Sequence, residues 1–302
     1  MITSRRKHLQ QLSTLAITPI IPSFTFHPTT SMLTRTTATG EQIPVIGLGT
    51  WQTFDVSSSP ENLGPLREVL KTLIAKGGKV IDSSPMYGRS EKVVGDLSTE
   101  LELNSKFFIA TKVWTTGKDQ GLKQMNESFG LLKRKQIDLM QIHNLVDWQT
   151  HLKTLYDWKQ QGKIRYIGIT HYTESAYPTI EQILKNNTID FLQINYSLLS
   201  RKAEERLFPL AQEKKTSILI NRPFEEGQLF SRAKGKELPP WASEFDCSSW
   251  GQFFLKFILA NPAVTCVIPG TSKPNHMADN ASAGFGSLPN TAHRKKMIEL
   301  FY

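Results

Sequence analysis

The chain has 302 residues, of which 39% are hydrophobic, so it can bury one large core or two modest ones. Lys and Arg together number 36 against 27 acidic residues, which gives a formal net charge of +9. No basic stripe interleaved with aromatic residues accompanies this charge, which argues against a nucleic-acid-binding protein. No apolar run approaches the roughly 18 to 20 residues of a membrane-spanning helix. The two cysteines, Cys247 and Cys266, lack the C-x-x-C spacing of metal sites and are expected to be reduced core thiols.

The N-terminal segment has the layout of an export signal. The first 40 residues contain no acidic residue, and a basic start precedes a weakly apolar stretch. "SRRKHLQ" resembles a twin-arginine motif in its Arg5, Arg6 and Leu9, with His8 where that motif usually has phenylalanine. No A-x-A cleavage site follows, and a disordered basic tail is the alternative. We expect residues 1–30 to be a twin-arginine signal that directs the folded protein to the periplasm; otherwise the protein is cytoplasmic.

From Leu33 onward, short apolar runs are each followed by a helical pattern. The runs are β-branched and apolar without strict alternation, as expected for strands covered on both faces. The runs are Val45–Leu48, Lys79–Ile81, Phe107–Val113, Ile137–Ile142, Ile164–Ile169, Ile189–Ile194, Ser217–Ile220 and Val264–Ile268. Between the first two, Leu63, Leu66, Leu70 and Leu73 repeat at the spacing of one helix face.

Helix boundaries are marked by capping residues and glycines. Ser90 is a candidate N-cap, and Ser249 with Gln252 forms an S-x-x-Q capping box ahead of an apolar helix. The glycines of "AKGGKV" and "QQGKI" stand where a helix would end before the next strand. These boundaries support the alternation of strands and helices.

Eight strands alternating with helices over about 250 residues predict a (β/α)8 TIM barrel, a single domain over residues 31–302. A doubly wound sheet is the alternative, and it is disfavoured because no G-x-G-x-x-G follows the first strand. The segment before Val45, with Thr34 and Gly40, is expected to be a hairpin that closes the bottom of the barrel.

Titratable side chains follow three neighbouring strands where each strand ends. Asp82, Lys112 and His143 stand at these ends, and Tyr87 follows on the loop after Asp82. In a (β/α)8 barrel the carboxyl ends of the strands carry the chemistry, so these four groups should meet at one rim. Each has an ordinary alternative, such as a snorkelling lysine or a satisfied core histidine. Four such coincidences at matching strand ends are much less probable than one.

The chain from about Leu33 to its end resembles an aldo-keto reductase. "VIGLGTW", a D-x4-Y-G motif from Asp82 to Gly88, "ATKVW" and "QIHN" occur in the order of that family's motifs. The resemblance implies a barrel that binds NADP(H) without a Rossmann fold and reduces aldehydes or ketones. It also implies that Asp82, Tyr87, Lys112 and His143 form the catalytic tetrad.

The chemistry of carbonyl reduction agrees with this assignment. A tyrosine with an ordinary pKa near 10 is a poor acid–base group at neutral pH, so a neighbouring ammonium should ease its deprotonation. Lys112 can serve as that ammonium, with Asp82 holding it charged and aimed. His143 would donate a hydrogen bond to the carbonyl oxygen.

The resemblance places further residues at the cofactor and the substrate. Thr50, Trp51 and Asp82 are expected at the cofactor, and Trp51 and Trp114 as walls of an apolar substrate pocket. Such a pocket favours apolar or aromatic carbonyl compounds over free charged sugars. The expected partner is therefore a small carbonyl compound, and the protein is expected to be a monomer without a metal.

Several cofactor positions depart from the family pattern. In "IGITHYT", Thr170 keeps a hydroxyl, but His171 replaces an amide; in "FLQINY", Gln193 matches a carboxamide contact. In "ILINRPFEEG", Asn221 stands where an aromatic usually stacks on the nicotinamide, and Arg222 or Phe224 could replace that stacking.

The segment "VIPGTSKPNHMADN" resembles the family's phosphate-and-adenosine segment. Its usual lysine is Gly270 and its later arginine is His276. The remaining candidates for the 2′-phosphate and the adenine are Thr271, Ser272, Lys273 and Asn280. NADPH is expected in preference to NADH.

Two functions of other classes stay open. A nucleotide-binding sensor could keep the barrel with little turnover, and the altered nicotinamide contacts favour it, whereas the intact tetrad opposes it. An aldolase- or isomerase-type barrel would need a Schiff-base lysine or a carboxylate base. Lys112 is the lysine best placed for it, but beside Asp82 it should stay charged and unsuited to that role.

Overall fold

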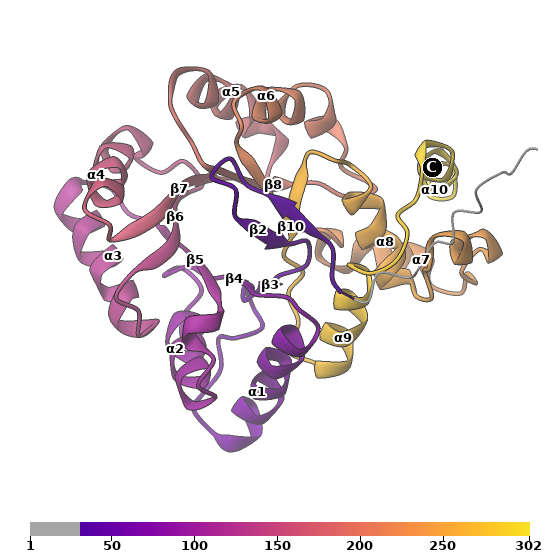
Figure 1. Ribbon diagram of the computed structural model, residues 1–302, viewed down its shortest axis with the longest axis horizontal. Coiled ribbons are helices and arrows are strands. Elements are labelled where there is room, and N and C mark those ends of the chain that lie inside the picture. The colour runs from indigo at the N-terminus through magenta and orange to yellow at the C-terminus, as the bar shows by residue number, and fades with distance from the viewer. Residues whose placement is uncertain (1–30) are drawn as a thin grey trace, which may run out of the picture.

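Eight parallel strands stand at the centre of the fold, in a computed structural model that describes residues 31–302 (Figure 1). Each strand pairs with the next one along the chain, from β3 to β10. The strands are β3 (Leu48–Gly49), β4 (Val80–Asp82), β5 (Phe108–Val113), β6 (Ile137–His143), β7 (Ile164–Thr170), β8 (Phe191–Asn195), β9 (Ser217–Asn221) and β10 (Val264–Val267). This sequential parallel order is that of a (β/α)8 barrel, as the sequence predicts.

The two ends of the sheet meet through isolated parallel bridges. Ile46 bridges Val267, and Gly49 bridges Gly270, which brings the sheet round into a nearly closed barrel. The predicted first strand, Val45–Leu48, is therefore wrong in its bounds, because only its end pairs continuously with β4. The segment before that end contributes a single bridge to β10 instead.

An antiparallel hairpin covers one end of the barrel. It consists of β1 (Thr34–Thr36) and β2 (Gln42–Pro44), which cross the middle of the view in Figure 1. Ile43 of this hairpin belongs to the apolar cluster inside the barrel. Glu41 in its turn pairs with Arg165 of β7, so both apolar and charged contacts fix the hairpin. The predicted hairpin is confirmed.

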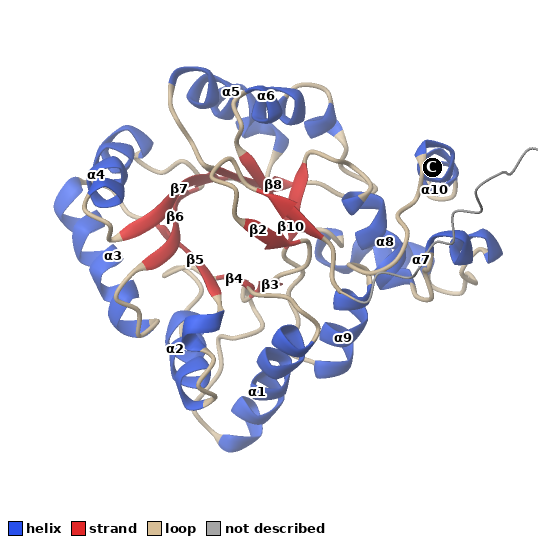
Figure 2. Ribbon diagram, viewed as in Figure 1, coloured by secondary structure: helices blue, strands red, loops and turns tan. Residues whose placement is uncertain are grey.

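Helices surround the strands (Figure 2). They are α1 (Pro60–Ala75), α2 (Ser90–Glu100), α3 (Lys118–Leu131), α4 (Trp148–Gln160), α5 (Tyr177–Asn186), α6 (Leu207–Glu213), α7 (Gln228–Ala233), α8 (Trp250–Leu259), α9 (Pro274–Ser282) and α10 (Thr291–Glu299). The predicted leucine face of α1 is buried at Leu66, Leu70 and Leu73. α8 is buried along nearly its whole length, which explains its apolar sequence.

The predicted helix ends hold in part. The Ser249 side chain accepts a hydrogen bond from the Gln252 N–H, as a capping box requires, but the Gln252 carboxamide accepts from Ser248 instead of Ser249. Ser90 is not the N-cap of α2: Arg89 takes that position, and the Ser90 hydroxyl donates to the Thr50 carbonyl. Ser90 is buried, and this hydrogen bond to Thr50 satisfies its hydroxyl.

None of the helices described within residues 31–302 is long and apolar enough to cross a membrane. Both cysteines in this range are free and buried, and burial raises the pKa of each thiol, to about 11 for Cys247. The segment proposed as an export signal lies outside the described residues.

Candidate active site

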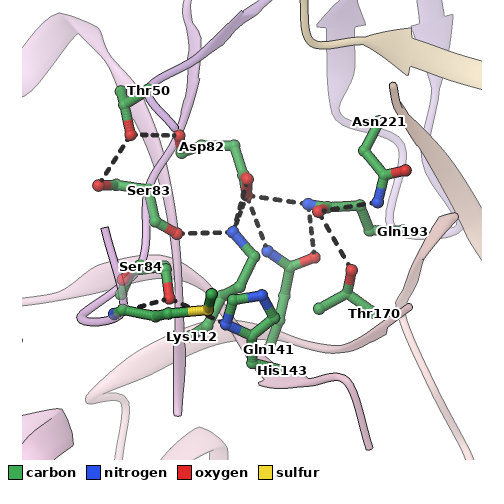
Figure 3. A network of polar contacts seen from close by, with 12 residues as sticks. Thr50, Asp82, Ser83, Ser84, Lys112, Gln141, His143, Thr170, Gln193 and Asn221 are labelled. Atoms are coloured by element: carbon green, nitrogen blue, oxygen red, sulfur yellow. Dashed lines mark hydrogen bonds and ion pairs between the residues drawn. The ribbon is translucent and has the colours of Figure 1, made fainter. Parts of the chain in front are cut away.

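The side chains that point into the barrel change from apolar to polar near the carboxyl ends of the strands. Residues two apart in a strand point to the same face, so the change can be followed along each strand. The pairs, with the apolar member first, are Val80 and Asp82, Ala110 and Lys112, Leu139 and Gln141, Phe191 and Gln193, and Leu219 and Asn221. The apolar members belong to one buried cluster. The polar members form a layer above it (Figure 3).

Asp82 and Lys112 form a buried ion pair in this layer. Lys112 is completely buried and Asp82 is 2% exposed. The Lys112 Nζ lies 2.6 Å from Asp82 Oδ1 and 3.0 Å from Oδ2, and it donates to the Ser83 carbonyl at 2.7 Å. Burial alone would lower the pKa of Lys112, but Asp82 and Tyr87 outweigh it and raise that pKa above its ordinary value. Lys112 is thus a fixed ammonium.

The Tyr87 ring contacts both this ammonium and the ring of His143. It stands on the loop between β4 and α2, with the Lys112 Nζ 4.8 Å from its ring centroid. Its ring meets the His143 ring edge-on, with 5.7 Å between the centroids. Burial raises the pKa of Tyr87, and the charge of Lys112 opposes that rise without cancelling it. The ammonium predicted from the sequence is in place, but burial keeps the phenol protonated at neutral pH.

His143 is a neutral hydrogen-bond donor in this arrangement. Burial, with the charge of Lys112 second, lowers its pKa to about 3. The Ser84 hydroxyl lies 3.0 Å from His143 Nδ1 and accepts from the Met86 N–H, so its own hydrogen is free for Nδ1. With Ser84 donating to Nδ1, the imidazole proton would be on Nε2, where it can be donated to an oxygen.

Two glutamine carboxamides of the polar layer contact Asp82, and one of them, Gln141, was not predicted. Gln141 and Gln193 both donate to Asp82 Oδ2, at 3.1 and 2.9 Å (Figure 3). Gln141 precedes His143 by two residues on β6, so strand periodicity could have placed it on the same inward face. That periodicity is the signal by which Gln141 could have been found from the sequence.

A pocket of about 550 Å³ opens above this layer. Asp82, Tyr87 and His143 line its inner wall, whereas Lys112 lies beneath them. Loops after several strands, together with α7, supply the outer walls, which are mainly apolar: Trp51, Met86, Tyr172, Pro223, Phe224 and, from α7, Phe230. A carbonyl group on an apolar body could therefore reach Tyr87.

Large apolar side chains are exposed around the mouth of the pocket. Trp51, Met86, Tyr172 and Phe230 line it, although each is at least 41% exposed. Trp114 is also exposed, and its ring centroid lies 6.3 Å from that of His143, but it is not among the lining residues. Exposed apolar groups gathered at one mouth indicate a binding surface.

The structure brings most of the predicted cofactor residues to this pocket. Those lining it are Thr50, Trp51, Asp82, Thr170, Gln193, Asn221 and Arg222. Within the described chain, His171 is not among the lining residues: its Nδ1 lies 3.2 Å from the Thr173 N–H nitrogen, and its ring stacks on Tyr172. The Arg222 guanidinium lies 4.8 Å from the Tyr172 ring centroid, so the two planar groups stand together at the pocket.

The proposed phosphate-binding segment lies beside the pocket. Among residues 31–302, its members Thr271, Ser272, Lys273, His276 and Asn280 are not among the lining residues, although Gly270 is. The Thr271 hydroxyl accepts from the Lys273 N–H at 3.1 Å, just before the start of α9. Asn280 is 5% exposed within α9.

The geometry and the sequence motifs agree with a family-level comparison. Residues 45–295 match the Aldo/keto reductase family, a stretch that contains Asp82, Tyr87, Lys112 and His143. The chain belongs to this family. The family match therefore covers the residues that form the polar layer of the barrel.

Curated relatives of this family member are distant. It is 28% identical to the aldo-keto reductase YhdN of Bacillus subtilis (strain 168), over 60% of this chain and 59% of that protein. It is 28% identical to the NADH-specific methylglyoxal reductase of Escherichia coli (strain K12), over 61% of this chain and 64% of that protein. The chain thus spans less than two thirds of the length of these two relatives.

Solved structures of aldo/keto reductases share the fold. One from Klebsiella pneumoniae, in complex with NADPH, has a TM-score of 0.74 at 22% identity, covering 89% of this chain and 95% of that one. AKR11C1 from Bacillus halodurans in its holo form has a TM-score of 0.73 at 22% identity, covering 90% and 97%. These similarities confirm the barrel.

Proposed function

We propose that this family member is an NADP(H)-dependent oxidoreductase that reduces aldehydes or ketones to alcohols, with Tyr87 as the general acid. The observation that carries the proposal is the buried Asp82–Lys112 pair, which lies against Tyr87 and next to a pocket lined by His143. Family membership and the NADPH bound to a structural neighbour support the choice of cofactor.

The residues at the pocket fit a nicotinamide ring. Asn221 donates through Nδ2 to the His171 carbonyl at 3.1 Å, whereas its Oδ1 is buried without a hydrogen-bond partner among the described residues. An unsatisfied buried acceptor costs about 1 to 3 kcal/mol, and the N–H of a carboxamide would satisfy it. Thr170, whose hydroxyl donates to Gln193, would hold the other side of the same group.

The other end of the dinucleotide would extend along the segment before α9. Thr271, Ser272 and Lys273 offer hydroxyls, backbone N–H groups and one positive charge for a phosphate. His276 and Asn280 would lie toward the adenosine. Because Lys273 can pair with a 2′-phosphate, NADPH is expected in preference to NADH.

Four side chains of this protein carry out the proton transfer and orient the substrate. A nicotinamide held at Asn221 and Thr170 would supply the hydride for the carbonyl carbon. Tyr87 holds a proton on its phenol oxygen and transfers it to the carbonyl oxygen as negative charge develops there. The Lys112 ammonium stabilises the resulting phenolate, and Asp82 fixes Lys112. His143 donates from Nε2 to the same carbonyl oxygen and orients it.

The test is consumption of NADPH, read as loss of absorbance at 340 nm, with aldehydes of different polarity. We expect benzaldehyde-like compounds to show a higher kcat/KM than a charged sugar acid, because the pocket walls are apolar. Trp51→Ala should raise KM for the aromatic aldehyde by roughly tenfold, the equivalent of about 1.4 kcal/mol of lost burial. Leu131→Ala, an exposed apolar residue on α3 away from the pocket, is the matched control.

The opposite outcomes are also informative. Nucleotide binding with no turnover of any carbonyl compound would favour the sensor alternative over a reductase. A preference for the charged sugar acid would refute the apolar substrate class while leaving the reductase assignment intact.

We also propose that the protein is exported through the twin-arginine route. The basis is the sequence around Arg5 and Arg6, which precedes the barrel. The expected result is a periplasmic protein in host cells, and an Arg5→Lys/Arg6→Lys variant retained in the cytoplasm. Equal periplasmic amounts of both forms would contradict export by this route.

A further inference from the structure

Two buried carboxamides have no role in the proton transfer described above. Gln141 on β6 is completely buried, and Gln193 on β8 is 2% exposed. A buried amide costs free energy unless its hydrogen-bonding groups are satisfied, so its partners indicate its role. Both side chains belong to the polar layer (Figure 3), and of the two only Gln193 is among the residues that line the pocket.

Their shared partner is one oxygen of Asp82. Gln141 Nε2 lies 3.1 Å from Asp82 Oδ2, and Gln193 Nε2 lies 2.9 Å from the same atom. The Lys112 ammonium is 3.0 Å from that oxygen as well. Three donors therefore converge on Oδ2 from three different strands, which leaves the carboxylate little freedom to rotate.

The two amides also brace each other. Gln193 Nε2 donates to Gln141 Oε1 at 3.1 Å, while Gln193 Oε1 accepts from the Thr170 hydroxyl at 3.1 Å and from Asn221 Nδ2 at 3.5 Å. An amide nitrogen carries two N–H donors, and within residues 31–302 both of those on Gln193 have protein acceptors. Both N–H groups of Gln193 are therefore used by Asp82 and Gln141, in a side chain that also lines the pocket.

A glycine makes the meeting of the two amides possible. Gly168 lies on β7, between β6 and β8, and is the register partner of Gln141. A Cβ atom at Gly168 would lie 2.7 Å from Gln141 Cγ, closer than real side chains approach. The missing side chain leaves the space that the Gln141 side chain occupies on its way to Gln193 and Asp82.

Carboxamides suit this place because they donate without adding charge. A second lysine or arginine here would compete with Lys112 for Asp82 and would change the field at Tyr87. A leucine would remove a donor from Asp82 and leave more of its negative charge uncompensated. Neutral donors keep Lys112 as the cation that acts on the phenol.

We propose that Gln141, braced by Gln193, is a positioning residue that fixes Asp82 and thereby sets the place of the Lys112 ammonium under Tyr87. This inference rests on the proposed reductase function. It assigns to Gln141 no contact with the substrate or the nucleotide. Its role is to hold the Asp82 carboxylate in place, so that the Lys112 ammonium keeps its position under Tyr87 during turnover.

The first test replaces Gln141 with methionine, which has a similar length and no N–H donor. We expect kcat to fall by about 10- to 100-fold, because a small displacement of a catalytic group has effects of this size. KM and the Kd for NADPH should stay within about twofold of the wild type. Met140→Leu on the opposite face of β6 is the control, and its kcat should be unchanged. Wild-type kcat in Gln141→Met would overturn the proposal.

A second variant separates a donor role from simple core packing. Gln141→Glu places a carboxyl group at the same distance, which can donate to Asp82 only when protonated. Its kcat, relative to the wild type, should therefore recover as the pH is lowered, whereas Gln141→Met should show no such recovery. A constant ratio to the wild type across the pH range would overturn the proposal.

A readout without turnover keeps the two proposals distinguishable. A fluorotyrosine at position 87 reports its ionisation by ¹⁹F NMR in the nucleotide-free protein. In Gln141→Met the pKa of the residue at position 87 should rise. The displaced Lys112 ammonium would stabilise the phenolate less, and the Asp82 carboxylate would repel it more. An unchanged titration would overturn the role of Gln141, even if the protein proved to be no reductase. A shifted titration without carbonyl turnover would refute only the reductase function.

Discussion

Tyr87→Phe should lower the rate of carbonyl reduction by about 10² to 10⁴-fold, the usual contribution of a general acid. The phenol oxygen is the group beside the Lys112 ammonium that can give a proton to the substrate oxygen. The ring itself remains, so the edge-on contact with His143 and the pocket wall should persist. The measurement is kcat/KM from absorbance at 340 nm, with the nucleotide Kd from fluorescence titration as the control. Unchanged turnover would remove Tyr87 from its role.

The pH dependence of the wild type follows from the same residue. Reduction needs the protonated phenol, and the pKa of Tyr87 is raised above its ordinary value near 10. The rate of reduction should therefore be flat through neutral pH and decline only above about pH 10. The pKa of His143 is lowered to about 3, so no inflection from it is expected between about pH 5 and 8. An inflection near pH 6.5 that disappears in His143→Gln would contradict the neutral state of His143.

Lys112→Met should abolish measurable reduction and also destabilise the fold. The substitution leaves the Asp82 carboxylate buried without its ion-pair partner, which costs about 3 to 5 kcal/mol of unfolding free energy. Tyr87 also loses the positive charge that opposes the effect of burial on its pKa. Urea denaturation measures the first effect, and the absorbance assay, run well below the denaturation midpoint, measures the second.

A double variant separates these two effects. Asp82→Asn with Lys112→Met removes both buried charges, so the free energy of unfolding should recover relative to Lys112→Met alone. Reduction should not recover, because no ammonium lies beneath Tyr87. A double variant as unstable as the single one would show that the ion pair is not the source of the loss. Recovered activity would contradict the role of Lys112.

The sequence by itself was sufficient for the architecture and for four of the site residues. Eight apolar runs alternating with helical patterns identify the barrel, because strand and helix periodicities are local properties of the chain. Asp82, Lys112 and His143 could be placed together because the carboxyl ends of parallel barrel strands share one rim. Tyr87 could be placed at the same rim because it stands on the short loop that follows Asp82. Family motifs then gave these four residues their expected roles.

Contacts across strands needed the tertiary structure. The meeting of Gln141 with Gln193 depends on the register of three strands and on the space left by Gly168 between them. A strand pattern shows that a side chain points inward but does not show which inward group it reaches. The short first strand likewise depends on how the two ends of the sheet meet. At the start of α2, the Ser90 hydroxyl donates to the Thr50 carbonyl and does not cap the helix.

The ionisation of the site was also decided in three dimensions. The sequence contains an ammonium that can ease the deprotonation of Tyr87, but it does not state how deeply the phenol is buried. Burial outweighs the ammonium for Tyr87 and makes His143 a neutral donor. Local pattern therefore determined which chemical groups this protein brings to the rim. Only the packed barrel, through burial and distance, determined their protonation states and their partners.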